Sequence, residues 1–279
     1  MLPGAGVRRM RNGSFFETEP GVELYYEVSG EGPPLVFVPG WTFTIEVFDH
    51  QVAHFSKTHQ VVSFDPRSQG RSTVTLQGND YATQSADLAK LIDHLDLRSP
   101  VIVGWSYGCL PLWGLVRLRG TQSLRGLVFI DMPPAPVTGS DEWTEMSVAQ
   151  AADFYQALTT AKGHRDCITA YVQEAMVQRD LAPEELDWIV GQSTRSPPWI
   201  AAAYCAAGMF SDYQREAQEV DRMLPTLFVV AESSADVAKT YLDTRLPNAQ
   251  AEFFGGHMMF WEYPEKFNAV LERYLRGLA

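Results

Sequence analysis

The chain has 279 residues, of which 46% are hydrophobic, and it carries a formal net charge of −12 with a pI near 4.9. This length is within the range of one large α/β domain, and the apolar content is sufficient for a core. The acidic balance argues against nucleic acid or an anionic membrane as a partner.

The sequence gives no sign of a targeting segment or of a metal site. Residues 1–14 contain basic side chains but no following apolar run, which predicts a flexible leader rather than a signal peptide. No window approaches 18 consecutive apolar residues, so no membrane-spanning helix is expected. An odd number of cysteines without CxxC spacing is typical of free thiols in a reducing compartment. We therefore expect a cytoplasmic protein with no metal and no cofactor; its cysteines are Cys109, Cys167 and Cys205.

Short apolar runs bounded by turn residues recur along the chain and predict strands. The first, Val22–Val28, predicts an antiparallel edge strand. The later runs are mostly unbroken, as in strands of a parallel sheet that is covered on both faces. Helical spacing of apolar residues occurs between them, at Tyr81–Leu95, Leu110–Leu118 and Lys266–Leu275, and this alternation predicts a doubly wound, mostly parallel α/β fold. The unbroken runs are Leu35–Val38, Val61–Phe64, Val101–Val103, Leu127–Ile130, Leu227–Val230 and Glu252–Phe254.

One long region departs from this alternation. Residues 132–224 contain no convincing strand, only helical patterns such as Asp153–Leu158 and Ile168–Val177. Because strands resume afterwards, we interpret the region as an insertion rather than as a second domain. The predicted organisation is a core of residues 15–131 and 225–279, with a helical lid of residues 132–224 over the carboxyl ends of the strands.

The stretch VIVGWSYG, Val101–Gly108, indicates a catalytic nucleophile. A buried strand ends at Gly104, Ser106 follows, and Gly108 opens an apolar helix. In this strand–turn–helix context, G-x-S-x-G predicts a sharp turn in which larger side chains at the glycine positions would clash. A serine hydroxyl is a poor nucleophile at neutral pH, so Ser106 needs an adjacent base.

We call this strand–turn–helix segment around Ser106 the elbow. Three further motifs accompany it: VPGW at Val38–Trp41, DPRSQGRS at Asp65–Ser72 and GGHMMFWEYPEKF at Gly255–Phe267. With them, the chain resembles the α/β-hydrolase fold superfamily over nearly its whole length, from about Val22 to Leu275. The second motif matches the D-x-R-x-x-G-x-S loop of that superfamily. The resemblance implies that Asp65 and Arg67 shape this turn rather than take part in the chemistry.

The resemblance also implies the base and the oxyanion hole. His257 follows the last strand on a glycine-flanked loop, where the superfamily places its general base. The backbone N–H groups of Trp41 and Tyr107 would stabilise the oxyanion. Trp41, Trp105 and Tyr107 are also predicted to line an apolar substrate pocket. The other histidines are not predicted to be catalytic, and His164, in the polar sequence KGHRD, is expected to be solvated.

Two positions compete for the acid that orients the base. In most of the superfamily the acid follows the strand Leu227–Val230, where the alignment places Ser234. Glu232 is two residues early and Asp236 two residues late, and Asp236 is interpreted as an acid at a helix N-terminus. Asp131 stands at the end of the preceding strand, where some branches of the superfamily place the acid. We predict Asp131 and keep Asp236 as the less favoured alternative, while a turn-capping role for Asp131 before two prolines also stays open.

Together these residues predict a serine hydrolase that cleaves a carboxylic ester or lactone with an apolar body through an acyl-enzyme. Ser106 excludes the haloalkane dehalogenases and most epoxide hydrolases, which use an aspartate nucleophile. Three alternatives stay open: a cofactor-free dioxygenase of hydroxylated heteroaromatics with the same Ser, His and Asp, a carbon–carbon bond hydrolase, and a non-catalytic ligand receptor on the same fold.

Overall fold

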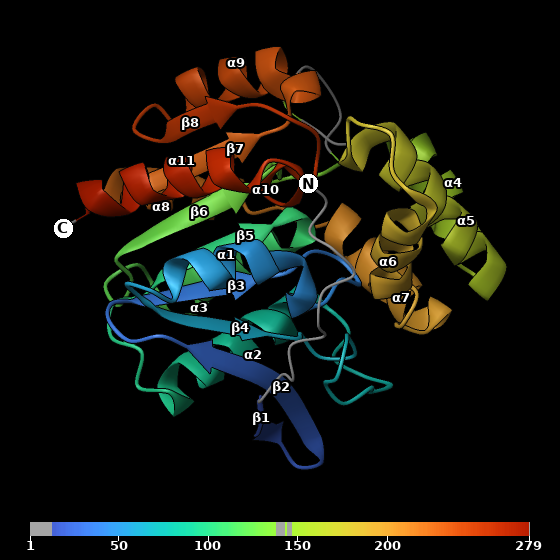
Figure 1. Ribbon diagram of the computed structural model, residues 1–279, viewed down its shortest axis with the longest axis horizontal. Helices are drawn as coiled ribbons and strands as arrows, with labels where there is room; N and C mark the ends of the chain where they lie inside the picture. The colour runs from blue at the N-terminus through green and yellow to red at the C-terminus, as the bar shows by residue number, and fades with distance from the viewer. Residues whose placement is uncertain (1–12, 138–142, 144–146, 279) are drawn as a thin grey trace.

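The computed structural model describes residues 13–137, 143 and 147–278. Within them, eight strands form one sheet in the order β1-β2-β4-β3-β5-β6-β7-β8 (Figure 1). β2 pairs antiparallel with β1 and with β4, and every pair from β4 to β8 is parallel, so the predicted mostly parallel sheet is confirmed. The strands are β1 (Ser14–Glu19), β2 (Val22–Ser29), β3 (Pro34–Val38), β4 (Gln60–Phe64), β5 (Val101–Trp105), β6 (Gly126–Ile130), β7 (Thr226–Val230) and β8 (Gln250–Phe253).

The antiparallel edge of the sheet differs from the prediction. The edge strand is β1, whereas β2 lies second and is paired on both sides. β1 begins at Ser14, inside the segment predicted as a leader, and only Thr18 in it is buried, so no apolar pattern marked it. Gly21, with φ 78°, makes the left-handed turn that returns the chain into β2. The rest of the predicted leader, residues 1–12, lies outside the described residues.

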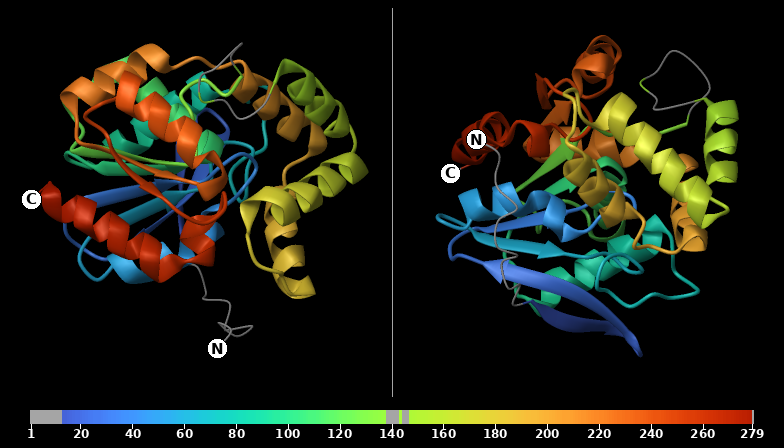
Figure 2. Two further views of the ribbon diagram at one scale, coloured as in Figure 1. Left: turned by 90° about the horizontal axis from the view of Figure 1, so that it is seen from above. Right: turned by 45° about the vertical axis from the view of Figure 1, so that its right-hand side comes forward.

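Helices cover both faces of the sheet, which buries every residue of β5, β6 and β7 (Figures 1 and 2). This double burial is the physical reason for their unbroken apolar runs. α1 and α11 pack together on one face, and α2, α3 and α8 pack together on the other. The core helices are α1 (Asp49–Phe55), α2 (Tyr81–His94), α3 (Leu110–Arg119), α8 (Gln214–Met223), α9 (Ala235–Arg245), α10 (Met259–Glu262) and α11 (Pro264–Gly277).

Between β6 and β7 the described residues contain helices and no strand. Four helices and one π-helical turn gather beyond the carboxyl ends of the parallel strands (Figure 1), and we call them the cap. α8, although inside the predicted lid, packs on α3, where Glu216 accepts two hydrogen bonds from Arg117. The cap is therefore shorter than the predicted insertion; it comprises α4 (Val148–Ala157), α5 (Ala161–Tyr171), the π turn (Val172–Met176), α6 (Pro183–Ser193) and α7 (Pro198–Met209).

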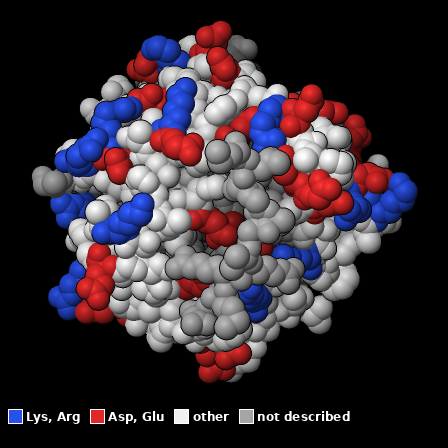
Figure 3. Space-filling view, in the orientation of Figure 1, with Lys and Arg blue, Asp and Glu red and all other residues white. Residues whose placement is uncertain are grey.

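Charges of both signs are interspersed on the face shown in Figure 3, including the part formed by the cap. Among the described residues, no helix is both long and apolar enough to cross a bilayer. The same residues contain no group of three or more His, Cys, Asp or Glu side chains placed to hold a metal ion.

Candidate active site

Ser106 lies in a tight turn between β5 and α3, as the elbow motif predicts. Its φ is 53°, a left-handed conformation that costs a non-glycine residue about 1–3 kcal/mol. A Cβ atom at Gly104 would lie 2.6 Å from the carbonyl oxygen of Gly108, and one at Gly108 would lie 2.4 Å from that of Pro39. Both glycines are therefore required by close backbone contacts, and the turn holds Ser106 at the carboxyl edge of the sheet.

His257 and Asp131 are in direct contact. The Nδ1 atom of His257 lies 2.6 Å from Oδ2 of Asp131, and the histidine is only 4% exposed. The other carboxylate oxygen of Asp131 accepts a hydrogen bond of 2.8 Å from the N–H of Ala231 at the end of β7. Asp131 also adopts a positive φ of 50°, and its own N–H donates to Val229. The carboxylate is thus held through both oxygens, and its contact with Nδ1 leaves Nε2 as the ring nitrogen that can take a proton.

The alternative acid lies elsewhere. Asp236 is exposed in the first turn of α9, where a carboxylate interacts favourably with the helix dipole. Glu232 is also exposed, and its backbone N–H donates to Gly255. Of the acids considered from the sequence, the structure thus brings Asp131, and not Asp236, to His257.

The loop that carries His257 is held from two sides. On the core side, Nε1 of Trp105 donates to the carbonyl oxygen of His257 at 2.8 Å. On the cap side, the N–H groups of His257 and Met258 donate to the carbonyl oxygens of Ala175 and Met176, at 3.0 and 2.8 Å. Both acceptors belong to the π turn, a helix irregularity that is frequent at functional sites.

The three predicted pocket residues lie in different surroundings. Trp105 is fully buried, and its ring centroid is 5.4 Å from that of His257, so its contacts favour support of the histidine over contact with a substrate. Tyr107 points to the cap, because a Cβ atom at Gly208 of α7 would lie 2.3 Å from its ring. Trp41 packs against Phe154 of α4, with ring centroids 5.6 Å apart. Trp41 and Tyr107 thus face the cap, whereas Trp105 faces the core.

The predicted oxyanion loop follows β3 and lies against the elbow. A Cβ atom at Gly40 would lie 3.1 Å from that of Ser106, which places the neighbouring Trp41 backbone beside the nucleophile. The far end of the loop is fixed by the carboxylate of Asp65, which accepts a hydrogen bond of 2.9 Å from the N–H of Ile45. Burial raises the pKa of Asp65 to about 6.

The DPRSQGRS loop makes structural contacts. The guanidinium of Arg67, 2% exposed, donates to both carboxylate oxygens of Asp87, at 3.0 and 2.9 Å. Asp65 accepts a second bond from the N–H of Arg71, and the hydroxyl of Tyr204 in α7 donates to the carbonyl of Arg67. The contact of Tyr204 ties this loop to the cap. The contacts of Asp65 and Arg67 are those of residues that shape the turn.

The expectation that His164 is solvated was wrong. It is 1% exposed, its ring centroid lies 5.7 Å from that of Trp41, and its Nε2 lies 3.2 Å from Oγ of Ser193. Burial lowers the pKa of His164 to about 4. The charged neighbours that suggested solvation, such as Lys162, are on the outer side of α5. Ile168, four residues after His164 and fully buried, marks the inner face of the same helix and was the available signal.

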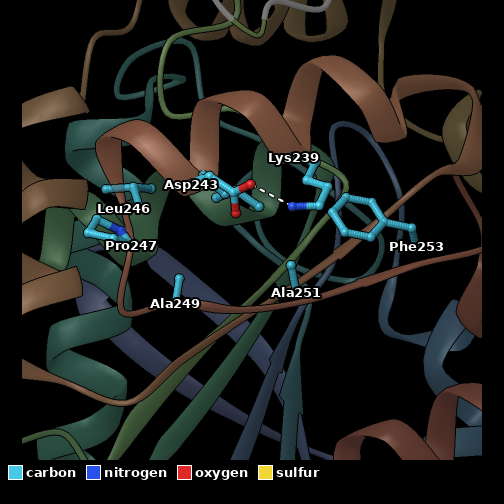
Figure 4. Close-up of a pocket in the computed structure, with 8 residues that line it drawn as sticks. Lys239, Asp243, Leu246, Pro247, Ala249, Ala251 and Phe253 are labelled. Atoms are coloured by element: carbon cyan, nitrogen blue, oxygen red, sulfur yellow. Dashed lines mark hydrogen bonds and ion pairs between the residues drawn. The ribbon is translucent and has the colours of Figure 1, made fainter.

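A surface hollow of about 240 Å³ lies between α9 and β8, and none of the candidate site residues lines it (Figure 4). Apolar side chains such as Leu246 and Phe253 line it, together with an ion pair of 2.5 Å between Lys239 and Asp243. β8 is the last strand of the sheet, three positions from the elbow strand β5. Because the hollow holds neither a serine nor a histidine, we place the candidate chemistry at Ser106 beneath the cap.

Comparison with known proteins agrees with this fold. The sequence profile of the alpha/beta hydrolase family matches residues 35–270, and the chain belongs to that family. A non-heme chloroperoxidase of Kitasatospora aureofaciens is 33% identical over 126 residues, which are 45% of this chain and 46% of that protein. An esterase from Exiguobacterium antarcticum superposes with a TM-score of 0.86 at 19% identity, covering 95% of this chain and 99% of the other. An enol-lactonase from Burkholderia xenovorans LB400 superposes with a TM-score of 0.77 at 21% identity, covering 94% and 100%.

Proposed function

We propose that the protein is a serine hydrolase that cleaves a carboxylic ester or lactone through an acyl-enzyme. The observation that carries this proposal is the contact of 2.6 Å between His257 and Asp131, on loops that flank the strained Ser106 turn. A serine, a buried histidine and a carboxylate on its Nδ1 are the three groups that nucleophilic acyl transfer requires.

In the proposed reaction, Oγ of Ser106 attacks the carbonyl carbon while Nε2 of His257 takes the hydroxyl proton. Asp131 stabilises the resulting imidazolium, and the N–H groups of Trp41 and Tyr107 bind the oxyanion. The carbon–oxygen bond of the ester then breaks, and His257 returns the proton to the leaving alkoxide. Water, deprotonated by His257, attacks the acyl-enzyme and releases the acid.

An apolar body is the proposed feature of the substrate. The indole of Trp41 and the ring of Phe154 lie on the cap side of the oxyanion loop, and Tyr171 packs on His257 with ring centroids 5.5 Å apart. Aromatic walls with few polar groups favour apolar acyl or alkyl groups. We propose that the cap acts as a lid and selects among them.

Rapid mixing with p-nitrophenyl butyrate tests the proposal. Wild-type protein is expected to release a burst of about one equivalent of p-nitrophenolate, followed by slower turnover, because the acyl-enzyme accumulates. Ser106→Ala is expected to show neither phase. Equal slow release by both proteins would overturn the proposed role of Ser106, and oxygen uptake with hydroxylated heteroaromatics would then test the dioxygenase alternative.

Peroxide chemistry is a second candidate, favoured by the chloroperoxidase among the similar proteins. Hydrogen peroxide can replace water as the nucleophile that attacks an acyl-enzyme, which releases a peracid and regenerates Ser106. The peracid then oxidises a halide ion and is itself reduced to the acid. Halide oxidation that needs both acetate and peroxide, and that is lost in Ser106→Ala, would support this activity; oxidation that persists in the variant would contradict it.

A further inference from the structure

A buried polar chain links the cap to the predicted oxyanion loop. Oγ1 of Thr42 donates to the carbonyl oxygen of Trp41 at 2.6 Å and also contacts Oγ of Ser193, the last residue of α6. Ser193 in turn contacts Nε2 of His164 in α5. The three polar side chains are each at most 1% exposed. Most buried polar side chains in folded proteins are hydrogen-bonded, and the contacts among these three residues give each of them a partner.

The hydrogen bonds that link His164, Ser193, Thr42 and Trp41 can be donated in one direction. A hydroxyl has a single proton, and that of Thr42 goes to the carbonyl of Trp41. The hydroxyl of Ser193 must then donate to Thr42, and Nε2–H of His164 must donate to Ser193. This order assigns the Nε2–H tautomer to His164, consistent with the neutral ring that its lowered pKa of about 4 indicates.

The chain ends at the residue whose N–H is proposed to bind the oxyanion. Thr42 has a φ of 63°, a conformation that a β-branched residue rarely adopts without support. Trp41 is held at its carbonyl by Thr42 and at its indole, where Nε1 donates to Ala201 of α7 at 2.8 Å. Residues of three cap helices, α5, α6 and α7, therefore fix the position of Trp41.

A second hydrogen bond between the loop and α6 lies beside this relay of side chains. Oγ1 of Thr44 donates to Oε1 of Gln192, whose Nε2 donates to Glu46 at 2.9 Å. Thr44 and Gln192 are also buried. Because Gln192 and Ser193 are consecutive in α6, the end of this helix holds the loop at two points, Thr44 and Thr42.

We propose that His164, Ser193 and Thr42 form a relay of positioning residues by which the cap holds the carbonyl of Trp41 and so sets the position of the residue whose N–H is proposed to bind the oxyanion. This inference rests on the proposed function, because it assigns the relay to acyl transfer. A shift of about 1 Å in a catalytic group can lower the rate about 100-fold, so loss of one hydroxyl should act on the transition state rather than on substrate binding.

Matched pairs of variants test the relay. Thr42→Val removes the hydroxyl but keeps the β-branched shape, whereas Thr42→Ser keeps the hydroxyl. Ser193→Ala removes the central hydroxyl, and Thr194→Val removes the neighbouring one, which donates to the carbonyl of Val190 in α6 and not to the loop. We expect kcat for p-nitrophenyl butyrate to fall about 10- to 100-fold in Thr42→Val and Ser193→Ala with KM little changed. Thr42→Ser and Thr194→Val should stay within about twofold of the wild type.

Two further readouts separate positioning from simple loss of packing. The inhibition constant of 1-butaneboronic acid, which forms a tetrahedral adduct with the serine, should rise in proportion to the loss of kcat, because the adduct uses the same oxyanion donors. Hydrogen exchange of the backbone amides of residues 40–45 should be faster in Ser193→Ala and unchanged in Thr194→Val. Thermal melting identifies any variant that has lost its fold.

The outcomes are distinct. Wild-type protein with a burst, together with variants that melt at lower temperature but keep kcat, boronate affinity and amide exchange, would overturn the relay and leave the proposed hydrolase intact. Equal slow release of p-nitrophenolate by the wild type and by Ser106→Ala would overturn the proposed function, and the catalytic role of the relay with it. Loss of kcat and boronate affinity that Thr42→Ser restores would support the relay.

Discussion

The core and the cap both hold the candidate site, but by different means. The core contributes the candidate reacting side chains at the ends of adjacent parallel strands: Ser106 after β5 and Asp131 after β6. The cap contributes supports, namely the carbonyls of the π turn under His257 and the hydroxyl of Ser193 behind the oxyanion loop. In this arrangement the strands place the candidate chemical groups, while the cap helices support the loops next to them.

The largest expected effect comes from the core side. Asp131→Asn should lower kcat for p-nitrophenyl butyrate about 10³–10⁴-fold, because an amide in this place favours the wrong tautomer of His257 and stabilises its charged form less. Steady-state kinetics at neutral pH measures this loss, with thermal melting as the control for folding. A loss below about tenfold would mean that the contact between Asp131 and His257 is structural.

The core part of the site is largely predictable from sequence because its signals are local. The elbow is a short motif between a strand and a helix, and His257 lies on a glycine-flanked loop after the last strand. Asp131 required one more step: Ser234 occupies the usual place of the acid, and a carboxylate stands at the tip of the neighbouring strand. The structure adds that the N–H of Ala231, directly after β7, donates to the second oxygen of Asp131.

The cap supports could not be predicted in the same way. Thr42 and Ser193 are 151 residues apart in the chain, and no local pattern relates them. The contact of the π turn with the His257 loop is made by backbone atoms, which leave no residue-type signature. His164 was misread because its sequence neighbours are charged, although the helix turns it inward. β1 was missed because an exposed edge strand needs few buried apolar residues, so no apolar pattern marked it.

A second prediction tests the junction between the cap and the His257 loop. In Gly256→Ala the new Cβ atom would lie 2.7 Å from the carbonyl oxygen of Met176 and 2.9 Å from that of Ala175, so backbone must move. We expect kcat to fall about 10- to 100-fold, because the histidine is displaced. Gly277→Ala, where no heavy atom lies within 4 Å of the new Cβ, is the control. Wild-type kcat in Gly256→Ala would show that the cap contact does not orient His257.

A third prediction concerns acid stability of the cap. The pKa of His164 is lowered from 6.5 to about 4, so above pH 6.5 the histidine is neutral whether the chain is folded or unfolded. As the pH falls below 6.5, only the unfolded chain takes the proton, and the free energy of unfolding should drop by about 2 kcal/mol between pH 7 and pH 5 from this group. His164→Gln keeps a side-chain N–H donor but does not titrate, so urea unfolding should show a smaller drop. An equal drop in both proteins would mean that other groups account for the acid sensitivity.

The smallest effect is expected at the start of α9. Asp236 is exposed at the start of α9, so Asp236→Asn should change kcat by less than about twofold and weaken only the favourable interaction with the helix dipole. The same kinetic assay used for Asp131→Asn provides the measurement, and the two variants form a matched pair because each replaces one carboxylate by an amide. A large loss in Asp236→Asn with little loss in Asp131→Asn would reverse the assignment. It would require His257 to turn toward α9 during the reaction, away from the strand tip where both oxygens of Asp131 are already held.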